Sequence, residues 1–563
     1  MNQKALSAAV EAARDGKSTL VVKNARVVNV FTGEVIPADI GIHGGSIIGV
    51  GKYSGEHQID AGGAYLAPGF IDAHMHIESS MVIPPTYART VLPLGTLAVI
   101  ADPHEIANVC GAAGIEAMLD FSENLPLCVY MMMPSCVPAT PFEHSGAVLL
   151  AKDLSEFRGN PRVLGLGEMM NYPGVLGADE EVMEKLCAFE NDFIDGHAPL
   201  LCGNALNAYC VAGAMSDHEC SNFEEAREKL RAGMFVMIRI GSAAHGVEEI
   251  LRGIVRENLP TDRLLFCSDD KHLENILRDG HINHNMRVAV ACGISPVDAV
   301  RMGTLNTARA YGLKRVGAIA PGYRADMVFL KDLKDFEVVG VIAGGKVYKD
   351  FIPEHVSVPK CVYSSVHVAP LGAEMLQIPA HENMPVVKTV PGQLVTQLVY
   401  RNVPSKDGLF APGEGFSKVA VIERHRASGN IGLGIVEGMP IRGGALASTV
   451  AHDSHNIVVL GDNDRDMLLA VSALEDCGGG YALVGGGVVI ARLPLPIAGL
   501  MTDAPASKVS ECQRALLDAL KSMGLDEKSD PLITLSFLAL PVIPAARVTD
   551  MGMFDAMNMR FIK

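Results

Sequence analysis

The sequence predicts an α/β protein: a (β/α)8 TIM barrel flanked by a small β-sandwich and followed by a C-terminal mixed α/β domain. Three observations support this. Residues 67–315 alternate apolar runs with helical stretches, as parallel strands with crossover helices do. Short β-like segments bracket this region, in residues 1–66 and 316–375. Residues 376–563 lose the alternation, and 563 residues exceed what one hydrophobic core supports.

The flanking segments predict one β unit built from both sides of the barrel. After a short amphipathic helix in residues 1–16, β-like runs follow at 20–22, 25–30, 39–42 and 47–50. Thr32-Gly33 and Gly44-Gly45 mark turns between them. Similar runs return at 326–330, 338–342 and 346–348. We therefore expect the two groups to pack together.

The barrel region contains eight predicted strands, one for each repeat of the fold. They are residues 69–73, 96–101, 127–132, 163–168, 193–196, 215–217, 234–238 and 264–267. Between them, Ser221 to Glu224 predicts the start of a helix to 232, and Ser295-Pro296 the start of one to 310.

The last third of the chain is harder to order. Residues 352–392 are rich in proline and predict an extended connection. Beyond it, β-like runs occur at 418–422 and 457–460, and a helix is expected at 464–476.

Composition limits the classes of function. The chain is 49% apolar and 20% charged, as a well-buried globular protein is. Its net charge of −17 argues against nucleic acid or an anionic membrane as the main partner. The 12 cysteines are scattered, and neither a secretory signal nor a membrane-spanning apolar run is recognisable. We therefore expect a cytoplasmic location.

His74 and His76 stand one residue apart at the end of the first predicted barrel strand. Alternate strand residues share a face, so both imidazoles can reach one divalent transition metal ion. An isolated His-x-His pair is more often structural. Here, however, it follows Pro68-Gly69-Phe70-Ile71-Asp72, and the whole motif resembles the first strand of the amidohydrolase superfamily, metal-dependent hydrolases built on a TIM barrel.

Further metal-capable residues follow other strands, where barrel enzymes place their active sites. They are Glu168, His197, His218 and Asp269. The set fits two divalent ions: His74, His76 and Asp269 on one, His197 and His218 on the other, and Glu168 between them. Water shared by two cations becomes a hydroxide nucleophile at neutral pH, and Asp269 is the expected proton acceptor and donor. The choice of Asp269 over Asp270 rests on strand register.

Several stretches together resemble the bacterial adenine deaminases of the amidohydrolase superfamily. They are residues 77–81, 102–108, 167–171, 195–199, 216–219, 268–270 and 451–456. The resemblance implies hydrolysis of adenine to hypoxanthine and ammonia in purine salvage, with two ions of manganese or iron, or zinc, and a homodimer. One departure is Ile240, in Arg239-Ile240-Gly241-Ser242, where the family implies glutamate.

The remaining candidate residues concern the substrate. Deamination needs an acid near N1 of the purine, and we expect His104 in this role with Glu105 as its orienting partner, although Glu105 could instead form a salt bridge or a helix cap. Glu78, Ser79 and Asp270 are expected to line the substrate pocket, or Glu78 and Ser79 only to cap a helix. His452, Asp453 and His455 could close the site, bind a further ion, or form a surface turn.

Two alternatives stay open at this point. One is another amidohydrolase that acts on a cyclic amide or amidine, such as a guanine deaminase or a dihydroorotase-like enzyme. Many of those relatives bridge their metals with a carboxylated lysine, and the strand that holds Glu168 offers no lysine at that place. The other is a metal-free barrel with a structural role, which the presence of all six candidate ligands disfavours.

Overall fold

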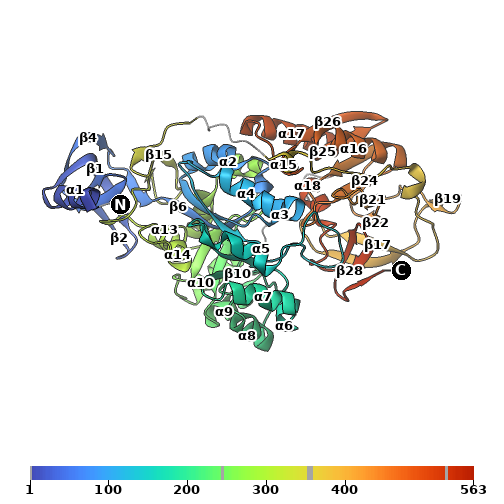
Figure 1. Cartoon of the computed structure of the whole chain (residues 1–563), viewed down its shortest axis with the longest axis horizontal. Coiled ribbons are helices and arrows are strands. Elements are labelled where there is room, and N and C mark those ends of the chain that lie inside the picture. Colours follow the sequence, from blue (N-terminus) through green and yellow to red (C-terminus); the bar gives the residue numbers. More distant parts are fainter. Residues whose placement is uncertain (1–2, 243–245, 352–358, 526–529, 563) are drawn as a thin grey trace.

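The structure is a computed structural model that describes residues 3–242, 246–351, 359–525 and 530–562 (Figure 1). A central barrel lies between an N-terminal sheet and a C-terminal domain. Its strands are β6 (Phe70–Met75), β7 (Thr96–Ala101), β8 (Cys128–Met133), β9 (Val163–Met169), β10 (Phe193–Gly196), β11 (Ser216–Asp217), β12 (Phe235–Arg239) and β13 (Leu264–Cys267). Each predicted barrel strand is present, with ends shifted by at most two residues.

The barrel strands are parallel and follow the order of the chain. One sheet runs β10-β9-β8-β7-β6 and another β11-β12-β13, and β10 contacts β11. At the other seam, Met75 and Asp269 form a parallel bridge between the end of β6 and the segment after β13. The eight strands thus close into the predicted barrel.

Helices cover the outside of the barrel. They are α2 (Pro84–Val91), α3 (His104–Cys110), α4 (Ala112–Phe121), α5 (Ala151–Ser155), α6 (Tyr172–Leu176), α7 (Glu180–Ala188), α8 (Gly203–Val211), α9 (Phe223–Arg231), α10 (Val247–Arg256), α11 (Leu273–Asp279), α12 (Ile282–Ala291), α13 (Pro296–Met302) and α14 (Leu305–Ala310). Short 3-10 turns occur at η1 (Ile77–Ser80), η2 (Leu92–Leu94) and η3 (Glu156–Gly159).

One helix prediction is confirmed and another needs correction. The helix predicted to start within 221–224 is α9, and its N-cap is Asn222, whose side chain accepts a hydrogen bond from the amide of Glu225. Ser295 caps α13 as predicted, but the single helix expected to residue 310 is two helices. The carbonyl of Gly303 accepts a hydrogen bond from the amide of Ile71 on β6, so it does not continue the helix.

The strands on either side of the barrel join in one eight-stranded sheet. It contains β1 (Lys17–Asn29), β2 (Glu34–His43), β3 (Ser46–Gly51), β4 (Ser54–Asp60), β5 (Tyr65–Pro68), β14 (Met327–Leu330), β15 (Val338–Ala343) and β16 (Lys346–Val347). Antiparallel pairing of β5 with β14 joins the two groups, as predicted. Helix α1 (Gln3–Arg14) contacts this sheet.

The C-terminal domain is built on a second eight-stranded sheet. Its strands, in spatial order, are β18 (Thr396–Arg401), β17 (Met384–Thr389), β22 (Ile431–Glu437), β21 (Phe416–Ile422), β24 (Ile457–Gly461), β23 (Gly444–Ser448), β25 (Gly480–Gly485) and β26 (Val488–Pro494). With it are α15 (Lys360–Tyr363), η4 (Ala373–Leu376), α16 (Asp464–Cys477), α17 (Ala506–Ser522), α18 (Pro531–Phe537), β19 (Ser405–Lys406), β20 (Leu409–Phe410), β27 (Ala546–Thr549), β28 (Gly552–Asp555) and β29 (Arg560–Phe561).

The prediction of an extended connection over 352–392 is wrong at its end, because β17 lies inside the C-terminal sheet, between β18 and β22. Residues 352–358 of that stretch lie outside the described residues.

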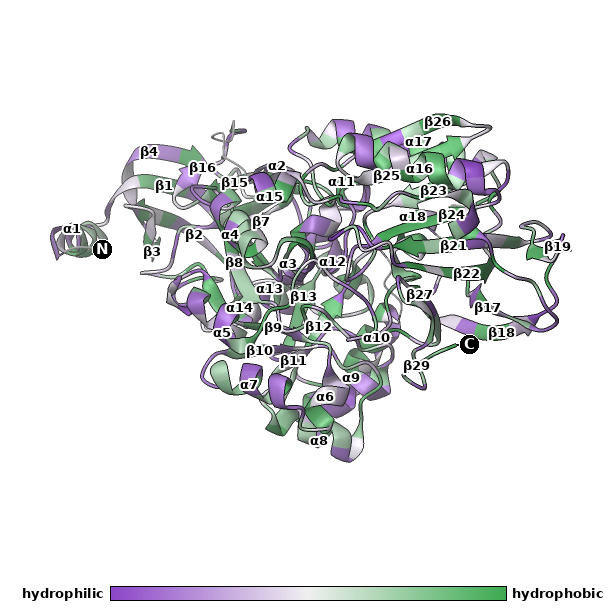
Figure 2. Ribbon diagram, turned by 45° about the vertical axis from the view of Figure 1, so that its right-hand side comes forward, coloured by the Kyte–Doolittle hydropathy of each residue, from purple (hydrophilic) through white to green (hydrophobic). Residues whose placement is uncertain are grey.

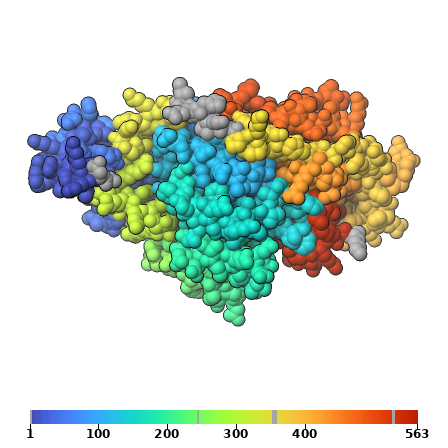
Figure 3. All heavy atoms as spheres, viewed as in Figure 1, coloured from blue at the N-terminus to red at the C-terminus, as the bar shows by residue number. Residues whose placement is uncertain are grey.

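Apolar residues concentrate on the strands of the barrel and of the C-terminal sheet (Figure 2). One large core continues from the barrel into the C-terminal domain, and a second lies between the C-terminal sheet and α16. The C-terminal domain lies directly against the barrel (Figure 3), and Val82 pairs with Thr502 across this boundary. Helix α3 starts immediately after β7 and meets the C-terminal segment 451–456. The end of the barrel that carries its strand-end residues therefore faces the second domain.

Candidate metal centre and substrate cavity

The six predicted metal ligands, His74, His76, Glu168, His197, His218 and Asp269, converge at the C-terminal ends of the barrel strands. All are buried except His197, whose side chain is 18% exposed. Their donor atoms form overlapping groups compact enough to hold a cation, among them His74 with His76 and Asp269, and His74 with Glu168 and His218. Imidazole nitrogens and carboxylate oxygens suit manganese, iron and zinc.

Glu168 lies between two pairs of histidines and turns one oxygen to each pair. Its Oε1 is 3.2 Å from His76 Nε2 and 3.6 Å from His74 Nε2. Its Oε2 is 2.6 Å from His197 Nδ1 and 3.2 Å from His218 Nε2. This is the arrangement that a carboxylate shared by two ions requires.

Asp269 and its neighbour Asp270 point to different partners. Asp269 Oδ1 is 3.0 Å from His76 Nε2 and 3.7 Å from His74 Nε2, and its Oδ2 contacts Arg239. Asp270 instead accepts a 2.5 Å hydrogen bond from Ser79 Oγ. The geometry therefore places Asp269, and not Asp270, among the histidines.

The far nitrogens of His74 and His76 are held so that both Nε2 atoms face the centre. His74 Nδ1 lies 3.2 Å from Asp195 Oδ2, and His76 Nδ1 lies 2.9 Å from the carbonyl oxygen of Asp102. Within the described residues, the fully buried His74 Nε2 has no hydrogen-bond partner. In a metal-ligating histidine, one ring nitrogen is held by a hydrogen bond and the other is free to bind the ion. His74 shows this pattern, so the donor set fits a divalent metal.

In this cluster the negative carboxylates and the positive histidines stabilise each other's charged forms. Burial opposes ionisation of Glu168, but the contacts of its carboxylate with His197, His218 and His74 hold its pKa well below the ordinary value. Burial likewise opposes a charged His74, yet Asp195 and Glu168 raise its pKa to about 10. In the protein alone these carboxylates attract protons to the histidines, and a bound cation would take the place of those protons.

Asp195, Arg239 and Glu219 are functional candidates that the sequence analysis missed. Asp195 also accepts a 3.0 Å hydrogen bond from Tyr311 Oη, which fixes it behind His74. Arg239 ends strand β12. Its Nη1 lies 2.6 Å from Glu219 Oε1 and also contacts Asp269 Oδ2. Because Arg239 ends a barrel strand, the rule that strand ends carry function applies to it as well.

A cavity of about 1080 Å³ opens beside the candidate metal centre, between the barrel and the C-terminal domain. His104, Glu105, Asp270, His452 and Asp453 line it, together with five of the six predicted ligands. Its outer wall is apolar and comes from both domains, and includes Leu201, Ile250, Phe537, Leu540 and Ile543. A cavity of this kind has the shape and lining of a small-molecule site.

Four predicted site residues do not line that cavity: His74, Glu78, Ser79 and His455. Glu78 Oε1 accepts a 3.2 Å hydrogen bond from the amide of Ile106 in the first turn of α3, a capping contact. Ser79 reaches the cavity only through Asp270. His455 lies behind Glu105, whose Oε2 it contacts.

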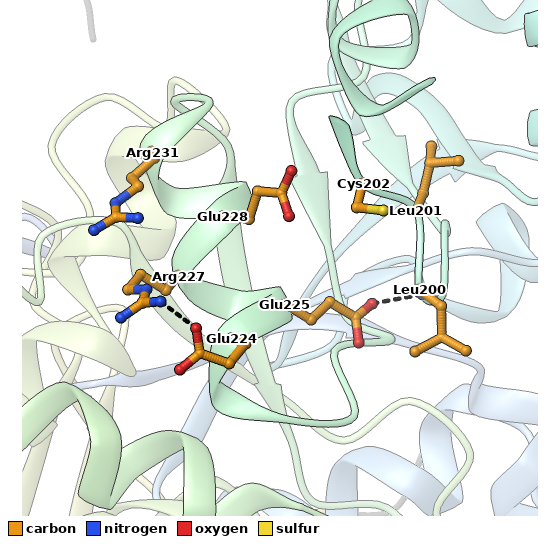
Figure 4. Close-up of a pocket in the computed structure, with 8 residues that line it drawn as sticks. All are labelled: Leu200, Leu201, Cys202, Glu224, Glu225, Arg227, Glu228 and Arg231. Carbon is orange, nitrogen blue, oxygen red and sulfur yellow. Dashed lines mark hydrogen bonds and ion pairs between the residues drawn. The ribbon is translucent and has the colours of Figure 1, made fainter. Parts of the chain in front are cut away.

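A second hollow, of about 440 Å³, lies between the start of α8 and helix α9 (Figure 4). Three of its charged residues have local partners: Glu225 accepts from the amide of Leu200, and Arg227 pairs with Glu224. It contains no predicted site residue. We therefore assign the chemistry to the larger cavity.

Comparison with known proteins agrees with this geometry. The amidohydrolase family model matches residues 65–348, and the adenine deaminase C-terminal domain model matches residues 393–560. An adenine deaminase of Nitratidesulfovibrio vulgaris is 48% identical over 553 residues, 96% of either chain. The chain belongs to the adenine deaminase family. Another adenine deaminase, from Clostridium acetobutylicum, is 47% identical over 97% of both chains, and one from Halalkalibacterium halodurans is 44% identical over 98% of this chain and 96% of the relative.

The departure of this adenine deaminase family member at Ile240 lies outside the substrate cavity. Met237, Ile238 and Arg239 line the cavity, whereas Ile240 does not, and its amide donates to the carbonyl of Cys267. Among the described residues, none of the helices combines the length and apolar character that crossing a membrane requires.

Proposed function

We propose that the chain hydrolyses adenine to hypoxanthine and ammonia at the cavity beside the six-residue cluster. The observation that carries the proposal is the position of Glu168, whose two oxygens face two separate histidine pairs. This geometry, in a chain of the adenine deaminase family, supports a hydrolase with two divalent ions rather than a metal-free barrel.

The cluster would hold two divalent cations, for which we propose manganese or iron, with zinc as a further possibility. His74, His76 and Asp269 would bind one ion, His197 and His218 the other, and Glu168 both. When bound, the ions lower the pKa of water, so that a strong nucleophile exists at neutral pH.

The proton acceptor is Asp269. It is buried and negatively charged, because Arg239 and His76 hold its pKa well below the ordinary value against the effect of burial. Its carboxylate takes one proton from the attacking water and delivers it to the departing amine nitrogen. The second proton of that water leaves the new C6 oxygen and replaces the one that His104 gives to N1, so that adenine and water yield hypoxanthine and ammonia.

The proton donor to purine N1 is His104. Its ring lies between Glu168 Oε1, 3.4 Å from Nδ1, and Glu105 Oε1, 3.4 Å from Nε2. Burial opposes its protonation, but the surrounding carboxylates, Glu105 foremost, raise its pKa well above the ordinary value. It can therefore carry a proton at neutral pH, with Glu105 as its orienting partner.

Asp270, His452 and Asp453 are the proposed contacts for the edges of the base, since they line the cavity next to His104. Burial raises the pKa of Asp453 to about 7, so its carboxyl group can donate as well as accept a hydrogen bond to a purine nitrogen. Ser79 holds Asp270, and Glu78 supports α3.

The test is ammonia release from adenine, adenosine, guanine and cytosine, with metal content determined on the same preparation. We expect release from adenine, and far less from the other three, by protein with close to two ions per chain. Release from guanine alone, or undiminished release by metal-free protein, would contradict the proposal. We also propose a homodimer, on the family resemblance alone; light scattering on the same sample measures it.

A further inference from the structure

The C-terminal segment 451–456 inserts two histidines against Glu105 of the barrel helix α3. Glu105 Oε2 is hydrogen-bonded to His455 Nε2, and its Oε1 forms an ion-pair contact with His452 Nδ1. Glu105 and His455 are each 1% exposed, and His452 is 7% exposed. A carboxylate from one domain is thus enclosed by imidazoles from the other.

The hydrogen bonds of His455 determine which of its nitrogens carries the proton. Its Nδ1 accepts from the amide of Ala451, at 3.1 Å, and therefore bears a lone pair. The proton of the neutral ring then sits on Nε2, which donates it to Glu105. Burial agrees with this neutral state, because it lowers the pKa of His455 to about 4.

This tautomer of His455 excludes a third metal ion bound by Glu105, His452 and His455 together. The three donor atoms of Glu105, His452 and His455 are close enough to surround a cation. A ligating nitrogen needs its lone pair free, however, and His455 Nε2 cannot ligate while its Nδ1 is the acceptor of a backbone amide. His455 is therefore a hydrogen-bond donor to Glu105.

His455 is itself held firmly. Arg424, fully buried, donates from Nε to the carbonyl of His455, from Nη1 to that of Ser365 at 2.9 Å, and from Nη2 to that of Ala498 at 3.0 Å. One side chain thereby ties three separate segments of the C-terminal domain together. The position of the His455 donor is consequently set by the domain core rather than by a free loop.

Glu105 connects His455 to His104, which lines the cavity. Its Oε1 lies 3.4 Å from His104 Nε2, and the other ring nitrogen of His104 faces Glu168, at 3.4 Å. A carboxylate fixed on one side by His455 restricts the orientation of the imidazole on its other side, as carboxylate–histidine pairs do in other enzymes. His455 does not line the cavity, so it acts only through Glu105.

We propose that His455 is a positioning residue for deamination: its Nε2–H fixes the carboxylate of Glu105, which in turn orients His104 toward the substrate. The inference rests on the proposed function. It makes the C-terminal domain part of the active site, because a donor 350 residues along the chain from Glu105 completes the catalytic arrangement.

The test compares four variants in the full-length, metal-loaded enzyme with adenine as substrate. His455→Phe removes the donor and keeps a ring, and His455→Gln restores an N–H donor. Glu105→Gln and the double variant E105Q/H455F complete a cycle. The matched control is His425→Phe: His425 Nε2 contacts the carbonyl of Ser454, at 2.8 Å, in the same segment, but has no contact with Glu105.

We expect H455F to lower kcat about 10- to 100-fold, the usual effect of losing a hydrogen bond to a charged group, and to change KM by less than about threefold. H455Q should stay within about fivefold of the wild type, and H425F near it. In the E105Q background, H455F should cost less than about twofold, because the two residues act in series. Metal content should be unchanged throughout.

Two results would overturn the inference: a kcat of H455F equal to that of the wild type, or effects of H455F and E105Q that multiply in the double variant. If H455F loses its thermal unfolding transition, H455N replaces it, because the shorter amide does not reach Glu105. A wild type that releases no ammonia from adenine would instead refute the proposed function, whereas an active wild type with an unimpaired H455F refutes only the role of His455.

Discussion

Met75 and Asp269 pair across the seam where the first and last strands of the barrel meet. The amide of Asp269 donates to the carbonyl of His74, at 3.0 Å, which locks the carboxylate beside the two histidines of β6. Closure of the barrel thus assembles three of the six candidate ligands from residues nearly 200 positions apart. The candidate centre depends on this closure, and its side chains can be tested one at a time.

Asp269→Asn keeps the shape of the side chain but removes its capacity to accept a proton. We expect kcat with adenine to fall by about 10²- to 10⁴-fold, the range for loss of a general base, with the thermal unfolding midpoint nearly unchanged. Asp270→Asn is the matched control, since Asp270 points to Ser79 and should affect mainly KM. A larger loss of kcat in D270N than in D269N would reverse the assignment.

Glu168→Gln should reduce metal content and activity together. An amide nitrogen in place of one oxygen disrupts a ligand that faces both histidine pairs, so we expect at most half of the wild-type metal per chain and a loss of ammonia release above about 100-fold. His218→Ala should behave similarly. Glu219→Gln is the comparison, because Glu219 lies 3.8 Å from His218 Nε2 but pairs with Arg239. Full metal occupancy in E168Q would exclude a bridging role.

Much of this arrangement could be predicted from the sequence, for a definite reason. In a barrel, function sits at strand ends, so histidines and carboxylates that follow apolar runs are candidates before any contact is known. The structure brings all six of them together, although their roles stay predictions. What local patterns could not predict is the set of partners behind them: Asp195 meets His74 across 121 residues and His455 meets Glu105 across 350.

The errors in the predicted fold have the same origin. Strand β17 was missed because proline is rare within sheets, and Pro385 lies within that strand. The strand pairs along its length with the next strand, β18, and at Val387 and Lys388 with β22. The helix expected from 296 to 310 breaks because β6, more than 200 residues earlier, takes the carbonyl of Gly303. In each case pairing with another strand overrides the pattern of the segment itself.

Removal and replacement of metal tests the cluster as a whole. Treatment with a strong chelator should abolish ammonia release, because the attacking water then has no bound cation to lower its pKa toward neutrality. Adding Mn²⁺ or Fe²⁺ to the metal-free protein should restore activity, and Zn²⁺ should restore less. The measurement is kcat against added equivalents, which should saturate near two per chain; saturation at one would leave His197 and His218 without an ion.

The substitution Ile240→Glu tests whether the departure from the family pattern matters. Since Ile240 does not line the cavity, we expect a change in kcat/KM of less than about threefold. Arg239→Ala provides the contrast: it removes the cation beside Asp269 and should impair turnover strongly. A gain in activity or an altered base preference in I240E would show that position 240 communicates with the substrate.

His425 predicts a specific acid sensitivity of the C-terminal domain. Burial, and then the charge of Arg424, lower its pKa to about 3, whereas the unfolded chain binds a proton near pH 6.5. The unfolded state therefore gains protons first as the pH falls below 6.5, and stability decreases by about 1 kcal/mol at pH 5.5 from this group alone. His425→Gln cannot titrate but keeps a donor for the carbonyl of Ser454. Between pH 7.5 and 5.5, the unfolding midpoint of H425Q should accordingly fall by about 1 °C less than that of the wild type; equal decreases would mean that His425 is protonated within the folded protein.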